Sequence, residues 1–179
     1  YKSGRVLDMA GVTEKTQAAG AMSIWDLSHS AGALEVNLNR CNVDFAVGCT
    51  YKYLNGGPGS PAFVFVASRH QGRALQPLTG WWGHATPFAF EETYRPAGDI
   101  RQMLCGTQSA LSMAIAEVGI DIFLRTDMAR IRAKSQVLTT LFIDLIEQRC
   151  ADCDFDIASP RDASRRGSQV AITHSQGFA

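Results

Sequence analysis

The spacing of apolar residues divides the first third of the chain into one helix and three strands. Residues 8–19 predict a helix, because apolar side chains recur at near-helical intervals and Asp8 is a suitable N-cap. Three apolar runs predict strands, at residues 21–26, 44–49 and 62–67. The last two runs are almost continuously apolar, which is typical of strands covered on both faces of a sheet.

The rest of the chain predicts a long loop, two helices and a further pair of strands. Residues 81–100 are rich in glycine, proline and aromatic residues without a period, and so long a loop usually has a functional reason. Helical spacing follows over residues 107–123 and 126–150, and the second helix would extend about 37 Å and could bridge two domains. Strands are predicted at residues 155–157 and 169–173. Strands that alternate with helices and loops predict an α/β fold.

Composition narrows the class of protein. The 179 residues include 17 basic and 17 acidic side chains, and this balance argues against a nucleic-acid or anionic-membrane surface. No apolar run reaches the roughly 20 residues of a membrane span, and no signal-peptide pattern opens the sequence. The five cysteines are an odd number, which favours reduced thiols and a soluble, cytoplasmic protein. Because Tyr1 is not an initiator methionine and no closing element precedes Ala179, we expect a piece of a longer polypeptide.

Asp26 and His29 follow the first predicted strand, in the segment WDLSHSAGA. Ligands of α/β sheets bind beyond the carboxyl ends of the strands, so this carboxylate could hold a cationic group while the histidine contacts the same ligand. The alternative is that Asp26 caps the helix that follows.

Lys52 follows the second predicted strand and opens the glycine-rich turn TYKYLNGGPGS. A partly desolvated lysine amine can attack a carbonyl as a Schiff-base nucleophile, although a loop lysine is commonly a solvated charge. The order of glycine and lysine is the reverse of a Walker loop, which argues against nucleoside triphosphate binding. Together with Asp26 and His29, Lys52 completes the set that pyridoxal phosphate chemistry requires. The lysine forms an imine with the cofactor aldehyde, and the acid keeps the pyridine nitrogen protonated.

Four segments resemble kynureninase, a family of fold-type-I pyridoxal-phosphate enzymes related to aspartate aminotransferase. They are WDLSHSAGA, TYKYLNGGPGS, QPLTGWWGH and LCGTQ. The resemblance implies that residues 1–124 are the C-terminal part of the large, cofactor-binding domain with its mostly parallel sheet. Residues 125–179 would be a connecting helix and the start of the small α+β domain. The family's upstream half and its C-terminal substrate-binding arginine have no counterpart in this sequence.

The resemblance also implies roles for individual residues. Lys52 would be the Schiff-base lysine, Asp26 the acid facing the pyridine nitrogen, and His29 a second cofactor-site residue. Tyr51 would reach the cofactor phosphate and is a candidate proton donor in catalysis. Trp81 and Thr107 would also bind the phosphate. Thr107 would do so from across the interface of a homodimer. Indole N–H, phenol and hydroxyl groups are hydrogen-bond donors that suit a phosphate dianion.

The activity implied by the resemblance is hydrolytic cleavage of the Cβ–Cγ bond of L-kynurenine or 3-hydroxykynurenine in tryptophan catabolism. The products would be anthranilate, or its 3-hydroxy form, and L-alanine. One alternative is another enzyme of the same fold, such as a cysteine desulfurase or a class V aminotransferase. Another is a non-catalytic fragment or interaction module.

Two weaker features carry open interpretations. Cys150 and Cys153 form a CxxC pair that could be redox-active or half of a zinc site, but no second pair or nearby histidine completes four ligands, and we expect no metal. His84 could line the substrate pocket or be a polar loop residue.

Overall fold

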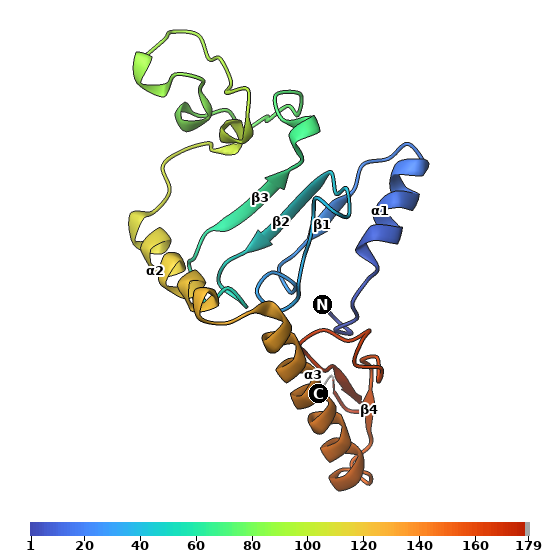
Figure 1. Ribbon diagram of the computed structural model, residues 1–179. Coiled ribbons are helices and arrows are strands. Elements are labelled where there is room, and N and C mark those ends of the chain that lie inside the picture. Colours follow the sequence, from blue (N-terminus) through green and yellow to red (C-terminus); the bar gives the residue numbers. More distant parts are fainter. Residues whose placement is uncertain (178–179) are drawn as a thin grey trace.

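The computed structural model describes residues 1–177 (Figure 1). Its main sheet has three strands, β1 (Ile24–Asp26), β2 (Phe45–Cys49) and β3 (Ala62–Val66), in the order β1-β2-β3. All three predicted strands are confirmed. β1 and β2 run parallel, but β2 and β3 run antiparallel, so this part of the sheet is mixed. The antiparallel return arises because the intervening residues form a closed turn in which the Thr50 N–H donates to the Pro61 carbonyl at 3.2 Å.

Helix α1 (Met9–Ala18) lies beside β1 (Figure 1). The Asp8 carboxylate accepts a hydrogen bond from the Gly11 N–H at 3.1 Å, which confirms the predicted N-cap. Met9 packs with Trp25 against the core residues of the sheet. Thr13 is fully buried, and its hydroxyl accepts a hydrogen bond from the indole N–H of Trp25 at 3.0 Å.

Replacing Thr13 by valine is expected to lower the free energy of unfolding by about 1–3 kcal/mol. Valine keeps the shape of threonine but leaves the Trp25 indole N–H without its acceptor. Urea denaturation would measure the loss. Thr16→Val is the matched control, since the Thr16 hydroxyl only donates to the Val12 carbonyl of its own helix. An equal loss of stability in both variants would contradict a stabilising role for the hydrogen bond between Trp25 and Thr13.

The two faces of the main sheet differ in burial. On the core face, Leu27, Val43 and Ala46 are buried, and Trp25 and Phe65 pack against them. The opposite face exposes apolar side chains, namely Ile24, Val47 and Val64. The expectation that these strands are covered on both faces is therefore wrong within residues 1–177, because α1 contributes to only one side.

A buried carboxylate secures the start of β2. Asp44 is 3% exposed and accepts a hydrogen bond from the Ser23 N–H at 2.9 Å, which joins the starts of β1 and β2. The other donors to this carboxylate are the Gln17 amide at 3.0 Å, the Ser23 hydroxyl at 3.0 Å, Arg69 at 2.6 Å and His70 at 2.7 Å. Asp44 therefore links α1, β1, β2 and the 3-10 turn η1 (Ser68–His70) that follows β3.

The predicted long loop is confirmed, and it is interrupted only by short 3-10 turns: η2 (Trp81–Gly83), η3 (Pro87–Ala89) and η4 (Ile100–Met103). His84 is buried inside it. The Nδ1 of His84 accepts from the Thr86 N–H at 3.0 Å, and its Nε2 lies 3.3 Å from the Thr93 carbonyl. His84 thus organises the loop.

Two helices and a small sheet complete the fold. Helix α2 (Ala110–Asp121) continues into the 3-10 turn η5 (Ile122–Arg125), and helix α3 (Met128–Arg149) follows. Strands β4 (Phe155–Ile157) and β5 (Ile172–His174) pair antiparallel beside α3 (Figure 1). β5 begins later than predicted, because the Ala171 N–H donates to the Ser159 hydroxyl at 2.7 Å and not to a strand carbonyl. Residues 165–167 pair with residues 4–6 near the start of the chain. Within residues 1–177, no helix is both long and apolar enough to cross a membrane.

Candidate functional site

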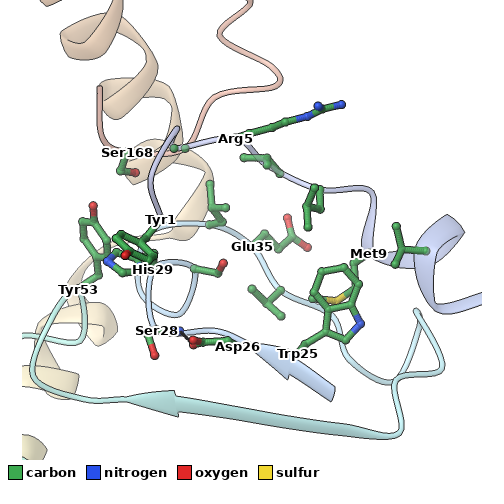
Figure 2. A pocket seen from close by; sticks show the side chains of 18 of the residues that line it. Tyr1, Arg5, Met9, Trp25, Asp26, Ser28, His29, Glu35, Tyr53 and Ser168 are labelled. Atoms are coloured by element: carbon green, nitrogen blue, oxygen red, sulfur yellow. Dashed lines mark hydrogen bonds between the residues drawn. The ribbon is translucent and has the colours of Figure 1, made fainter. Parts of the chain in front are cut away.

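A cavity of about 760 Å³ runs along β1 and includes the loop at its carboxyl end (Figure 2). Asp26, His29 and Lys52 all line it. Because β1 and β2 are parallel neighbours, the loops that follow them meet at one edge of the sheet. The expected meeting of these loops is confirmed.

Lys52 and His29 are in direct contact. The Lys52 amine lies 3.3 Å from His29 Nε2, and both side chains are half-buried. A lysine ammonium can only donate, so His29 Nε2 is the acceptor and the imidazole proton lies on Nδ1. Lys52 is therefore held inside the cavity, which is not the environment of a freely solvated loop lysine.

Asp26 is an ionised carboxylate at the end of β1. Hydrogen bonds from the side chain and backbone of Ser28 lower the pKa of Asp26, and the positive charge of Lys52 adds to this effect. The Ser28 N–H donates to Asp26 Oδ1 at 2.8 Å, which forms an Asx-turn. Asp26 thus caps a tight turn and no helix, since residues 27–34 contain only turns.

His29 lies between two aromatic rings. It stacks on Tyr1, with 6.0 Å between ring centroids, and meets Tyr53 edge-on at 6.5 Å, as Figure 2 shows. Burial lowers the pKa of His29, and the charge of Lys52 lowers it further, while Asp26 opposes the change. His29 is therefore neutral at pH 7 and can accept a hydrogen bond from Lys52.

Removal of the charge at position 52 is expected to raise the pKa of His29 toward its ordinary value of 6.5. Lys52→Met keeps the aliphatic stem and removes the ammonium group that disfavours imidazolium. The His29 ring signals, followed by NMR between pH 5 and 8 (roughly the histidine range), give the pKa directly. Lys134→Met, at an exposed lysine on α3, is the control. Equal His29 pKa values in the wild type and in Lys52→Met would contradict the contact between the Lys52 amine and His29.

Tyr51 and Tyr53 flank Lys52 but lie in different places. Tyr51 is exposed and outside the cavity lining, with its ring centroid 5.3 Å from the Lys52 amine. Tyr53 lines the cavity, and sequence reasoning did not identify it as a site residue. Both tyrosines belong to the same glycine-rich segment, so the sequence gives no signal that only Tyr53 lines the cavity.

Trp81 and Thr107 lie outside this cavity. β3 runs antiparallel to β2, so the segment after β3 leaves from the end of the sheet opposite Lys52. Trp81 is exposed and stacks on Trp82 with 4.3 Å between ring centroids. Gly80, which precedes Trp81, lies directly against Cys105, because a Cβ built on Gly80 would overlap the Cys105 carbonyl. The segments that carry Trp81 and Thr107 are therefore neighbours. His84 also lies away from the cavity lining.

Metal ligands do not gather in the part of the chain that the structure describes. No three histidine, cysteine, aspartate or glutamate side chains within residues 1–177 are placed to share an ion. Cys150 and Cys153 are free thiols, as are the other three cysteines.

Comparison with known proteins shows which family the chain resembles. Residues 131–179 match the family described as the kynureninase C-terminal domain. A curated kynureninase of Burkholderia mallei is 51% identical over 178 residues, and one of Pseudomonas fluorescens is 50% identical over 179 residues. These alignments cover 99% and 100% of this chain.

The chain is therefore similar to kynureninases along almost its whole length. It spans 43% of the length of these two curated kynureninases. The four segments that carried the resemblance lie within the aligned region.

Solved structures show the same fold. A cysteine desulfurase from Thermococcus onnurineus NA1 superposes with a TM-score of 0.76 at 19% identity, covering 97% of this chain and 42% of that one. A C-DES mutant with glycine covalently linked to its PLP cofactor gives a TM-score of 0.78 at 14% identity, covering 100% of this chain and 46% of that one. The kynureninase-like chain therefore has the α/β fold of this group of enzymes.

Proposed function

We propose that this protein is a pyridoxal-phosphate enzyme that hydrolyses the Cβ–Cγ bond of L-kynurenine, with 3-hydroxykynurenine as a further substrate. One observation carries the proposal: the Lys52 amine lies 3.3 Å from His29 in a cavity that Asp26 also lines. The 50–51% identity to curated kynureninases supports this activity over that of a cysteine desulfurase.

The residues of the cavity fit the proposed cofactor. Lys52 offers a half-buried amine for the aldehyde, and Asp26 is held as a carboxylate, as a partner for a protonated pyridine nitrogen requires. The flat ring of His29 offers a surface beside both groups. When bound, pyridoxal phosphate supplies an electron sink for charge that develops at the α- and β-carbons of the substrate.

The protein's own residues would bind the substrate and move protons. Lys52 would hold the cofactor aldehyde before the substrate binds, and its amine would take the α-proton of kynurenine. Tyr51, whose ring centroid lies 5.3 Å from the Lys52 amine, would donate a proton to the β-carbon as water adds to the γ-carbonyl and the Cβ–Cγ bond breaks. The products would be anthranilate and L-alanine.

We further propose a cytoplasmic homodimer. Trp81 and Thr107 lie away from their own cavity, so each would reach the cofactor phosphate in the cavity of a second copy. The many exposed apolar residues of α2 support such a contact. We place the boundary between large and small domains at residues 124 and 125; the match to a C-terminal domain over residues 131–179 agrees with this division.

The proposal is tested by anthranilate fluorescence in the full-length enzyme with added pyridoxal phosphate. L-Kynurenine should give anthranilate and L-alanine in equal amounts, whereas L-cysteine should release no sulfide. Sulfide release without anthranilate would assign the protein to the desulfurases. Absence of any visible absorbance change on cofactor titration would favour the non-catalytic module.

A further inference from the structure

The turn that follows Lys52 is a rigid unit. The Asn55 N–H donates to the Lys52 carbonyl at 3.1 Å, and the Gly56 N–H donates to the Thr50 carbonyl at 2.9 Å. Asn55 has a left-handed φ of 62°, which fixes the path of the backbone. A shift of Leu54 or Asn55 therefore moves the Lys52 backbone with it.

Helix α2 contacts this turn at Gly119. A Cβ at this position would lie 2.7 Å from the Asn55 carbonyl carbon and 2.7 Å from the Leu54 carbonyl oxygen, although ordinary contact begins at 3.4 Å. Both are backbone atoms, which cannot rotate away. Glycine inside a helix costs about 1 kcal/mol relative to alanine. Gly119 lacks a positive φ, so close approach is the structural reason for it.

The same turn also contacts Gly32. A Cβ there would lie 2.6 Å from the Tyr53 carbonyl oxygen and 3.1 Å from the Leu54 nitrogen. Gly32 belongs to the same loop as Asp26 and His29, so this contact sets the spacing between that loop and the Lys52 turn. The φ of Gly32 is +84°, which adds a second requirement for glycine.

We propose that Gly32 and Gly119 are positioning residues that clamp the turn at residues 53–55 through two separate backbone contacts and so place the Lys52 amine against His29. The clamp works through direct backbone contact, for which only glycine leaves room. Alanine at position 119 would push the turn away by about 0.7 Å, the difference between 2.7 Å and 3.4 Å. The consequence for catalysis rests on the proposed function, but the placement of Lys52 does not.

The test compares Gly119→Ala with Gly98→Ala. Gly98 has no atom within 4 Å of a built Cβ and no positive φ, so it is a matched control. In the full-length protein without cofactor, brief acetylation with acetic anhydride is quantified at each lysine by mass spectrometry. Lys15 and Lys134 are exposed and serve as internal references for the half-buried Lys52.

In the wild type and Gly98→Ala, Lys52 should acetylate about tenfold more slowly than the references, because its ammonium is hydrogen-bonded to His29. In Gly119→Ala the difference should disappear, and the pKa of His29 should rise toward 6.5. Pyridoxal phosphate should then attach to Lys52 about 100-fold more slowly than in the wild type.

Gly32→Ala provides a second variant, at the other contact with the turn, and should give the same pattern. Unchanged Lys52 acetylation in a folded Gly119→Ala or Gly32→Ala protein would overturn the inference. Loss of the folded state in both, judged by circular dichroism, would also overturn it, because the contacts would then support the fold as a whole. Acetylation needs no cofactor, so a wild type that binds no pyridoxal phosphate would refute the proposed function alone.

Discussion

Lys52→Ala in the full-length enzyme is expected to abolish both the visible absorbance of the lysine–cofactor imine and the production of anthranilate. The variant lacks the only lysine that lines the cavity in the described part of the chain. Loss of a covalent nucleophile that also moves a proton should reduce kcat on the order of 10⁴-fold or more. Absorbance spectra and anthranilate fluorescence on the same sample measure the two effects.

The control for Lys52→Ala is Lys134→Ala, at an exposed lysine in α3. It should keep wild-type absorbance and turnover. Retained activity in Lys52→Ala would remove Lys52 from the catalytic role. Loss of activity with an unchanged imine band would place the cofactor on a different lysine.

Asp44→Ala is expected to lower the free energy of unfolding by about 3–5 kcal/mol. The substitution leaves the buried Ser23 N–H without an acceptor and removes the charge that Arg69 pairs with at 2.6 Å. Urea denaturation measures the loss. Asp152→Ala, at an exposed position, should change the free energy by less than about 0.5 kcal/mol. Equal stability of the two variants would contradict a structural role for Asp44.

The same carboxylate gives stability a pH dependence at the acid end. Burial alone would raise the pKa of Asp44, but hydrogen bonds from Gln17, Ser23, His70 and Arg69 outweigh it and hold the pKa far below 3.8. The unfolded chain therefore binds a proton more readily than the folded chain. The stabilisation is complete above pH 3.8 and is lost progressively as the pH falls further, toward the folded-state pKa. In Asp44→Ala, the slope of unfolding free energy against pH below this value should be shallower.

The helices and strands were predicted well from the sequence, because the caps and the apolar spacing that specify them lie within each segment. Asp8 caps α1 as predicted, and the apolar runs form β1, β2 and β3. The meeting of Asp26 and Lys52 also followed from sequence, since successive strand ends in a parallel pair share one sheet edge.

What sequence reasoning missed depends on contacts between distant residues. The Asp44 network joins donors from α1 and η1 that no spacing rule connects. The antiparallel return of β3 placed Trp81 away from Lys52, although both follow apolar strands. Gly119 interrupts a predicted helix, and that interruption was the one available signal of its contact with the Lys52 turn.

The arrangement of the three tryptophans provides two separate optical reporters. Trp25 is half-buried and hydrogen-bonded to Thr13, so its emission follows the packing of α1 on the sheet. Trp81 and Trp82 form a stacked pair in the distant loop, and Phe88 meets both rings edge-on. Tyrosine at both loop positions would leave Trp25 as a single probe, with which denaturation of the sheet could be recorded independently of the loop.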